Sequence, residues 1–467
     1  MDIPTSDAPA QHSASARDRA FCAHPYTNLM AHQHSGPMVV TRGEGIRVWD
    51  EDGNAYIEGL AGLWCTSLGF SEPRLVAAAA RGLSRLPFYH SFGGKSPAPT
   101  IDLAERLIGL APAPMSKVLF ANSGSEANDT AIKLIWYYNN ALGRPQKKKI
   151  LSRQRAYHGV TVASASLTGL PANHRDFDLP LERMLHAECP HHWRHAKPGE
   201  SEEDFATRLA DSLEQLIVRE GPETIAAMFA EPVMGAGGVI VPPATYFAKI
   251  QAVLARYDIL LVADEVICGF GRTGNLWGCE TYAIRPDMIT CAKALSSGYI
   301  PISALMISEP IWQAMVAESE KIGVFGHGFT YSGHPVAAEV ALETLAIYAE
   351  RDIVGHVRAV APALQDGLRQ LADHPLVGEA RGVGLVGALE LVADKATKEP
   401  FTPTLGVAAL AAKRAEANGV IIRALGGDVL AFSPPLIIEA AEIDDMLARV
   451  ARALDETQAR LRNAGHG

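Results

Sequence analysis

Residues 259–299 read ILLVADEVICGFGRTGNLWGCETYAIRPDMITCAKALSSGY, and this stretch decides the fold. It opens with the apolar run Ile259 to Val262, which is short enough to be a strand buried on both faces. Asp264 follows where that strand should end, and a second short apolar run, Met288 to Ala292, stops at Lys293. Because ligands bind outside the carboxyl ends of strands in open α/β sheets, we expect Asp264 and Lys293 to point into one crevice.

An acid and a lysine in one crevice suggest a particular cofactor. Pyridoxal phosphate requires a lysine for its Schiff base and an acidic group on its pyridine nitrogen. The alternative is a surface lysine together with a strand-end aspartate that caps a helix. These two residues alone leave both interpretations open.

The composition indicates a globular protein. Of the 467 residues, 48% are apolar and 20% are charged, which is typical of a chain with a substantial core. The net charge of −10 argues against a nucleic acid or an anionic membrane as a partner. The six cysteines are scattered without CxxC pairs, so we expect reduced thiols. Since no apolar segment resembles a signal peptide or a membrane span, we expect a cytoplasmic location.

Four parts are expected along the chain. Residues 1–20, rich in Ala, Ser, Asp and Pro without an apolar period, predict a disordered tail. Residues 21–70 are expected to join the small domain, and residues 71–335, in which strands alternate with helices, to form a large α/β domain. Residues 336–467 are poorer in strands and are expected to form a smaller α+β domain.

A strand followed by small residues and a helix suggests an anion site. Val118 to Ala121 is strand-like, Asn122 to Ser125 is a small-residue turn, and helical spacing begins at Glu126. Such a turn offers free N–H groups, hydroxyl donors and the positive end of a helix dipole to a phosphate. The alternative is a plain N-cap serine with Glu126 and Asp129 in the first turn.

Other polar residues follow strand-like runs or small-residue loops. Tyr157 and His158 come after the run ILS, Glu231 ends the run IAAMFA, and Thr330 precedes a long helix. The segment 185–195, LHAECPHHWRH, gathers histidines and a cysteine. Its spacing matches no standard zinc pattern, so we predict no metal site there.

An ordered set of motifs carries a family resemblance. The motifs are NSGSEAND with Ser125, YHG with Tyr157, EPVMGAGGVIVPP with Glu231, ADEVICGFGRTG with Asp264, AKALSSGY with Lys293 and GFTYSGHP with Thr330. From about Phe21 to its end, the chain resembles class III aminotransferases, which are fold type I pyridoxal-phosphate enzymes. Within that class it is most similar to ω-transaminases, through HPYT with Tyr26, MVVTRGEG, AGLWC with Trp64, LPFY with Phe88 and IIRALGGDVLAFSPPL with Arg423.

The resemblance implies roles for these residues. Lys293 would bind pyridoxal 5′-phosphate and act as general base and acid. Asp264 would pair with the ring nitrogen. Tyr157 would be a third catalytic residue and would cover one face of the ring, with Val266 on the opposite face. The cofactor-binding set is Ser123, Gly124, Ser125, Tyr157, His158, Glu231, Asp264, Val266, Lys293 and Thr330. Of these, Gly124, Ser125 and Thr330 would bind the phosphate, Thr330 from the neighbouring subunit. The substrate-binding set is Tyr26, Trp64, Phe88, Tyr157, Ala236 and Arg423.

One departure within the class bears on the substrate. Similar ornithine- and GABA-type enzymes usually read EPxQGEGG, where the second glutamate pairs with the carboxylate-binding arginine. This chain has EPVMGAGG, with Ala236 at that position. An unpartnered Arg423 would alternate between a substrate carboxylate and solvent, which suits an amino donor without a carboxylate and pyruvate as acceptor.

The expected function is therefore the transfer of an amino group from an amine or an ω-amino acid, such as β-alanine, to pyruvate or a similar keto acid. A site completed across subunits implies a homodimer, with pairing into tetramers left open. The alternatives are another fold type I enzyme, such as an ornithine- or GABA-type aminotransferase, a racemase or an aminomutase, and a silent relative. Neither nucleic acid nor membrane is expected as a partner.

Overall fold

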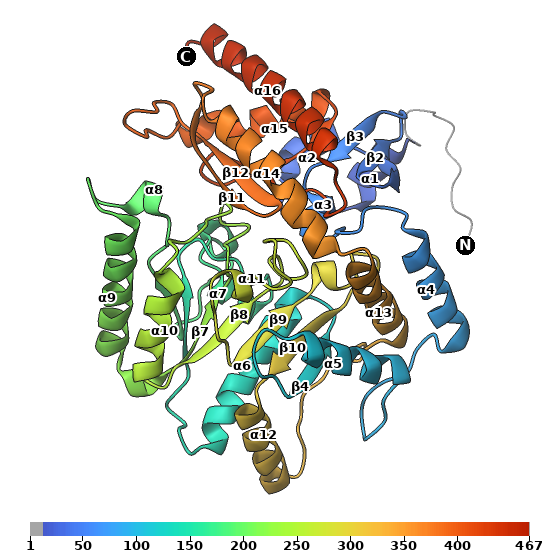
Figure 1. The fold of residues 1–467 in the computed structure, drawn as a ribbon, viewed down its shortest axis with the longest axis vertical. Helices are drawn as coiled ribbons and strands as arrows, with labels where there is room; N and C mark the ends of the chain where they lie inside the picture. The colour runs from blue at the N-terminus through green and yellow to red at the C-terminus, as the bar shows by residue number, and fades with distance from the viewer. Residues whose placement is uncertain (1–12, 467) are drawn as a thin grey trace.

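The computed structural model describes residues 13–466, and its centre is a seven-stranded sheet (Figure 1). The strand order is β4-β10-β9-β8-β7-β5-β6. Strand β10 runs antiparallel to both of its neighbours, and the other pairs are parallel. The predicted mostly parallel sheet is therefore confirmed. Its strands are β4 (Lys117–Ala121), β5 (Lys149–Arg153), β6 (Met184–Ala187), β7 (Ile225–Ala230), β8 (Leu260–Asp264), β9 (Met288–Cys291) and β10 (Ser303–Ile307).

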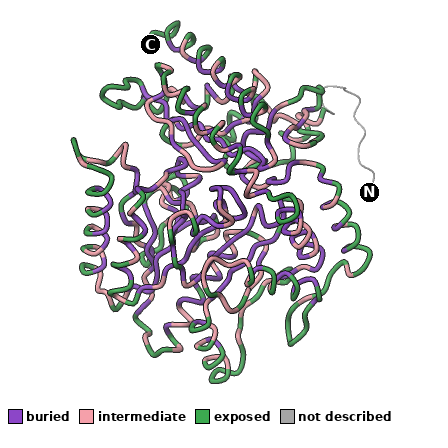
Figure 2. The backbone as a smooth tube through the Cα atoms, viewed as in Figure 1, coloured by how far each residue is buried: buried purple, intermediate pink, exposed green. Residues whose placement is uncertain are grey.

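Helices cover both faces of this sheet, because the apolar side chains of each central strand alternate between two cores. Leu261 and Ala263 of β8 belong to the larger core, whereas Val262 between them belongs to the other. The smaller core lies under α6 (Gly124–Ala141), α7 (Val162–Leu167) and α12 (Glu309–Ile322). The opposite face carries α5 (Ala98–Leu110), α9 (Glu202–Glu220), α10 (Tyr246–Arg256) and α13 (Pro335–Glu350). Figure 2 shows that the buried backbone, in purple, gathers in the centre of the molecule.

A second layer lies above the carboxyl edge of the large sheet in Figure 1. It contains an antiparallel sheet in the order β11-β12-β15-β14. Its elements are β11 (Val377–Val383), β12 (Val386–Leu391), β14 (Arg423–Leu425), β15 (Val429–Phe432), α14 (Ile353–Leu371), α15 (Val407–Ala417) and α16 (Ala440–Asn463).

The N-terminal segment pairs with this C-terminal part. A third sheet has the order β1-β2-β3-β13, and β3 and β13 are parallel with Ile57 opposite Val420. Its strands are β1 (Val40–Glu44), β2 (Arg47–Asp50), β3 (Ala55–Glu58) and β13 (Val420–Ile421). Strands β2 and β3 form an antiparallel hairpin pair.

The predicted disordered tail is wrong for the part that the structure describes. Residues Ala14–Phe21 form helix α1, which begins where the Ser13 hydroxyl accepts the Ala16 N–H. The sequence argument relied on an apolar period, and α1 has none because it buries no residue. Residues 1–12 lie outside the described part of the chain.

The remaining helices are short or lie at the periphery. They are α2 (Leu29–Ser35), α3 (Ala61–Trp64), α4 (Pro73–Arg85), α8 (His192–His195), α11 (Gly278–Thr281), and the 3-10 helices η2 (Pro171–Asn173), η3 (Pro222–Thr224), η4 (Lys293–Leu295) and η5 (Pro403–Leu405). Among residues 13–466, every helix is too short or too polar to span a bilayer.

Candidate active site

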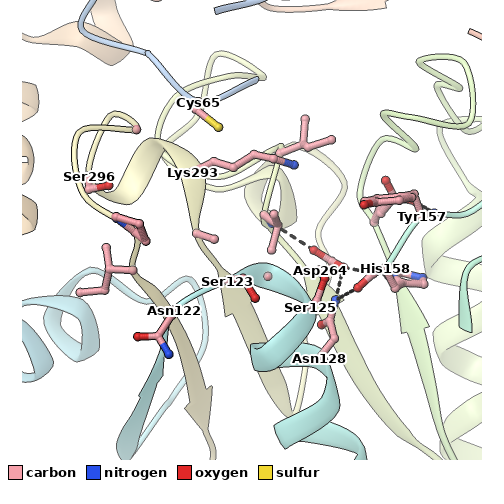
Figure 3. A pocket seen from close by; sticks show the side chains of 18 of the residues that line it. Cys65, Asn122, Ser123, Ser125, Asn128, Tyr157, His158, Asp264, Lys293 and Ser296 are labelled. Atoms are coloured by element: carbon pink, nitrogen blue, oxygen red, sulfur yellow. Dashed lines mark hydrogen bonds and ion pairs between the residues drawn. The ribbon is translucent and has the colours of Figure 1, made fainter. Parts of the chain in front are cut away.

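A cavity of about 340 Å³ lies at the carboxyl edge of the large sheet (Figure 3). It is lined by nearly all of the residues predicted to bind the cofactor: Ser123, Gly124, Ser125, Tyr157, His158, Glu231, Asp264, Val266 and Lys293. The lining also includes residues that were not predicted: Cys65, Asn122, Asn128, Ile267, Ala292, Ser296, Gly298, Ile300, Pro301 and Ile302.

The strand-end argument correctly predicted that Asp264 and Lys293 share one crevice. Strands β8 and β9 are parallel neighbours, with Asp264, the last residue of β8, opposite Thr290. Lys293 comes just after β9 and begins η4. Both side chains therefore leave the same edge of the sheet, and both line the cavity.

Three N–H donors fix the carboxylate of Asp264, which is only 3% exposed. Its Oδ2 lies 2.8 Å from Asn128 Nδ2 and 2.8 Å from His158 Nδ1, and its Oδ1 accepts the Val266 N–H at 3.1 Å. Hydrogen bonds from several donors stabilise a buried negative charge. Asp264 therefore presents an oriented anion to whatever occupies the cavity.

Asn128 was missed, although the sequence holds a signal for it. It lies one helical turn after Gly124, on the face of α6 that also buries Ala127 and Ala131. Its side chain donates to Asp264 and also, at 2.7 Å, to the carbonyl of His158. A polar side chain on a buried helix face requires hydrogen-bond partners. An asparagine at this position of the sequence therefore indicates a polar site beside the helix.

The environment of Lys293 favours the neutral form of its ε-amine. Burial lowers the pKa of Lys293, and the nearby Cys65, Asp264 and Glu231 only partly oppose this shift. Its backbone has φ of 48°, a left-handed conformation that costs a non-glycine residue about 1 kcal/mol or more. Figure 3 shows the Lys293 side chain extending across the cavity.

The turn before α6 has features of both earlier interpretations. The Ser123 hydroxyl caps α6 by accepting the Glu126 N–H at 3.2 Å, so the predicted N-cap is present. Gly124 and Ser125 line the cavity at the start of this 18-residue helix, where N–H groups lack helical acceptors and the dipole attracts anions. Capping and anion binding are compatible, because they use different groups of the same turn.

Two glycines keep this anion cradle open. A Cβ on Gly124 would lie 3.1 Å from Val266. Gly159, at φ 136°, approaches so closely that its Cβ would lie 2.5 Å from Ser125 Oγ. Next to it, the Val160 N–H donates to Ser125 Oγ at 3.1 Å. An added side chain is therefore excluded at Gly159, and at Gly124 it would require Val266 to shift.

Glu231 supports the wall of the cavity. Its carboxylate accepts the N–H of Tyr157 at 3.0 Å and the N–H of Gly235 at 3.0 Å. Burial raises the pKa of Glu231. This carboxylate therefore joins the Tyr157 backbone to the glycine-rich turn that contains Ala236.

Tyr26, Tyr157 and Arg423 come together at the rim of the cavity. The Cζ atom of Arg423 lies 5.9 Å from the ring centroid of Tyr26, and the Tyr26 hydroxyl accepts a hydrogen bond from Asn173 Nδ2 at 2.6 Å. Burial raises the pKa of Tyr157, and the neighbouring Tyr26 raises it further. Within residues 13–466 no carboxylate forms an ion pair with Arg423.

Trp64 does not line the cavity. It is 3% exposed and packs with Leu60, Val233 and Ile267. The chain reaches it through a left-handed turn, with positive φ at each residue from Ala61 to Trp64. Trp64 therefore supports the cavity wall from behind, since Ile267 is a lining residue.

Phe88, Thr330 and Ala236 also lie outside the lining residues. Phe88 is 39% exposed and packs edge-on against Tyr331, with 5.5 Å between ring centroids. Thr330, next to Tyr331, is exposed. The loops that carry Phe88 and Thr330 thus adjoin each other on the surface of this chain.

The residues of the cavity fit pyridoxal phosphate. The cradle between Gly124 and Gly159 suits a phosphate, the anchored Asp264 suits a protonated ring nitrogen, and Lys293 extends into the same cavity. The buried Nε2 atom of His158 and Oδ1 atom of Asn128 have no protein partner among the described residues. A lysine, a fixed aspartate and an anion cradle at the carboxyl edge of such a sheet define a fold type I pyridoxal-phosphate enzyme.

Comparison with known proteins gives the family. The class III aminotransferase family model matches residues 29–454, so the chain belongs to the class III aminotransferases and is a pyridoxal-phosphate-dependent transferase. It is 55% identical over 426 residues to a gamma aminobutyrate transaminase 3, chloroplastic, of Solanum lycopersicum, covering 91% of this chain and 82% of that protein. The silent-relative alternative is therefore set aside.

Solved structures agree with this assignment. The ω-transaminase from Pseudomonas jessenii in complex with PMP superposes with a TM-score of 0.94 at 55% identity, covering 97% of this chain and 100% of that one. A structure described as a transaminase with L-ala has a TM-score of 0.89 at 59% identity, covering 91% of this chain and 100% of that one.

Proposed function

We propose that this enzyme transfers an amino group from an amine or an ω-amino acid to pyruvate. The observation that carries the proposal is the half-buried Arg423 at the rim, which has no carboxylate partner within residues 13–466. Ala236 offers no carboxylate where similar enzymes have a glutamate. An unpaired guanidinium is available to bind the carboxylate of a keto acid in a bidentate manner.

The lining of the cavity favours pyruvate over a dicarboxylate acceptor such as 2-oxoglutarate. Among the described lining residues, Lys293 is the single cationic side chain. With Arg423 on one carboxylate, a second carboxylate would enter without a cation of its own, and burying an unpaired charge is costly.

The chain's own residues would divide the work of transamination. Bound pyridoxal phosphate supplies the electron sink. Lys293, with its lowered pKa, would take a proton from the substrate carbon and return it. Asp264 would hold the ring nitrogen protonated, and Ser123, Gly124 and Ser125 would bind the phosphate. Tyr157 and Val266 would cover the two ring faces.

GABA itself falls within the proposed donor class. The plant relatives are named gamma aminobutyrate transaminases, and the similar structure from Pseudomonas jessenii is described as an ω-transaminase. GABA carries its carboxylate several bonds from the reacting carbon, whereas pyruvate carries it on the adjacent carbon. Because Arg423 has no fixed partner, its side chain is free to bind the distant carboxylate of GABA as well as the nearby carboxylate of pyruvate. Assays of GABA, β-alanine and 1-phenylethylamine, each with pyruvate and with 2-oxoglutarate, test the proposed pairing.

Replacing Arg423 with alanine should weaken the half-reaction with pyruvate and spare the one with 1-phenylethylamine. We expect the pyruvate step to lose about 2 to 4 kcal/mol of transition-state binding, as for one partner of a desolvated charge pair. The amine step should change much less, because that donor has no carboxylate. Stopped-flow measurement of both half-reactions checks this.

Arg423→Lys is the matched control for charge without the planar fork, and we expect it to recover only part of the pyruvate step. Equal losses in both half-reactions, or no loss in either, would contradict the role of Arg423. A loss of about 0 to 1 kcal/mol in both would instead indicate an ordinary surface arginine.

We also propose a homodimer in which Thr330 binds the phosphate of the partner's site. Support comes from the exposed aromatic side chains on the adjoining loops, Phe88, Tyr89, Phe92 and Tyr331, because such patches favour interfaces. Thr330→Ala should weaken cofactor retention by about 1.5 to 3 kcal/mol, the value of a hydrogen bond to a charged group.

A mixed dimer distinguishes the two possible locations of Thr330. Where the Thr330→Ala homodimer is impaired, combining a Lys293→Ala subunit with a Thr330→Ala subunit leaves one intact site only if Thr330 serves its neighbour. We then expect activity to recover to about half that of the native dimer. No recovery in verified mixed dimers would mean that Thr330 acts within its own subunit, and full activity of the Thr330→Ala homodimer would mean that Thr330 has no role in the site.

A cytoplasmic location is part of the same proposal. All six cysteines are free thiols, and Cys189, Cys268, Cys279 and Cys291 are buried. Free thiols are typical of a reducing compartment. The named plant relatives are chloroplastic or mitochondrial, so fractionation of cells is the direct measurement.

A further inference from the structure

A cluster of two histidines and one aspartate lies in the N-terminal segment, apart from the residues that line the cavity. Asp18 comes from α1, His24 from the loop after it, and His32 from α2. The Nε2 atom of His24 lies 2.9 Å from both carboxylate oxygens of Asp18, and the Nε2 atom of His32 lies 2.9 Å from Oδ1. The two imidazole centroids are 4.0 Å apart.

We propose that Asp18, His24 and His32 bind a divalent transition-metal ion of the zinc type. Imidazole nitrogen and carboxylate oxygen are standard zinc ligands, at about 2.0 to 2.2 Å from the metal. A tetrahedral ion separates neighbouring ligand atoms by about 3.3 to 3.5 Å. The three ligand atoms here all lie within 4.8 Å of one another, so small side-chain rotations suffice. The fourth position would be open to water.

The surroundings of Asp18 leave its carboxylate without a lysine or arginine partner among the described residues, which favours binding of a metal ion. Within the described residues, no lysine or arginine forms an ion pair with Asp18, and its salt-bridge partners are the two imidazoles. The adjacent Arg19 donates instead to the carbonyl of Gln33 at 3.2 Å. In the described part of the chain, the Asp18 carboxylate therefore has no lysine or arginine that a metal ion would have to displace.

A second cluster has similar residues, but its carboxylates, unlike that of Asp18, are paired with arginines. His191, Glu379 and Glu390 also bring ligand atoms together. There, however, Arg381 lies 2.6 Å from a carboxylate oxygen of Glu390 and also pairs with Glu379, and Arg194 lies 2.5 Å from the other oxygen of Glu390. Guanidinium groups already neutralise these carboxylates, so the second cluster needs no metal.

The segment that holds the first cluster has little else to stabilise it. Helix α1 buries no residue, and α2 buries His32 alone. Apolar packing therefore contributes little to joining the two helices, and the polar cluster takes its place. Coordination bonds at one ion would fix α1, its following loop and α2 to one another.

The metal would also act on the active site, because Tyr26 lies between the ligands His24 and His32 in the chain. Tyr26 contacts Asn173 through its hydroxyl and faces Arg423 at the rim. Fixing the loop on both sides of Tyr26 would fix one wall of the substrate entrance. The metal would thus have a structural role next to the site, without touching the reacting atoms.

The test uses the full-length holoenzyme after treatment with a chelator. Equilibrium dialysis against Zn²⁺ should show saturable binding of one ion per chain, and hydrogen exchange across residues 13–36 should slow when Zn²⁺ is added. Asp18→Asn should weaken binding by about tenfold or more, since even outer partners of metal ligands change affinity by about 10- to 100-fold. His24→Ala and His32→Ala should do the same.

Two neighbouring residues provide matched controls. His34, exposed on the same helix as His32, and Cys22, an exposed thiol near His24, lie outside the cluster. His34→Ala and Cys22→Ser should bind Zn²⁺ as the native protein does. Absence of binding, equal binding by Asp18→Asn and His24→Ala, or loss in the two controls would each overturn the proposal. His24 is the decisive variant if His32→Ala disturbs folding, because its side chain is 30% exposed rather than 8%.

Discussion

Replacing Lys293 with alanine is expected to reduce the rate of transamination by about 10³-fold or more while leaving the fold intact. Proton transfer by a positioned side chain contributes about 10²- to 10⁴-fold, and the covalent link to the cofactor is lost as well. No other amine lines the cavity among the described residues, so nothing substitutes for Lys293. Turnover of an amine with pyruvate, followed spectrophotometrically, checks this.

The same variant should still bind pyridoxal phosphate without a covalent bond. The phosphate cradle, the Asp264 anion and the Tyr157 wall do not depend on the lysine side chain. Lys413→Ala is a suitable control, because this lysine on α15 has a side chain that is 75% exposed. Absorbance of a lysine-linked cofactor in Lys293→Ala would mean that a different lysine is the attachment site.

The regular elements of the large sheet were largely predictable from apolar runs. Strand β7 was predicted at Ile225 to Ala230 and has those bounds, and β8 differs from its predicted run by one or two residues at each end. These strands are buried on both faces, so their sequences are continuously apolar. Their polar ends follow directly, which is why Asp264 and Lys293 could be predicted to meet.

Contacts between distant segments could not be predicted. The pairing of β3 with β13 joins two residues near 57 to two near 421, too few for a sequence period. Substrate binding by Trp64 stays a prediction, and a left-handed turn that no local pattern encodes packs its side chain into a core of this chain. Asn128 was missed because its importance comes from Asp264 and His158, which are far from it in the chain.

The second large effect is expected from Asp264→Asn, which should lower the rate by about 10²-fold or more with little loss of folding. A neutral amide does not stabilise a protonated ring nitrogen, and charge-assisted hydrogen bonds are about twice as strong as neutral ones. The surroundings add to this loss. Oδ2 meets donors from Asn128 and His158 and Oδ1 meets the Val266 N–H, so an amide nitrogen in either position would face another donor.

Asp287→Asn is the matched control for this variant, since Asp287 lies at the opposite edge of the same two strands. Its carboxylate accepts the Leu261 N–H at 2.8 Å, an interaction that an amide oxygen can also make. We expect Asp287→Asn to keep the native rate, while Asp264→Asn loses it at similar thermal stability. A near-native rate in Asp264→Asn would show that another acid pairs with the ring nitrogen. A large loss in both variants would mean that the strands, rather than the charge of Asp264, had been disturbed.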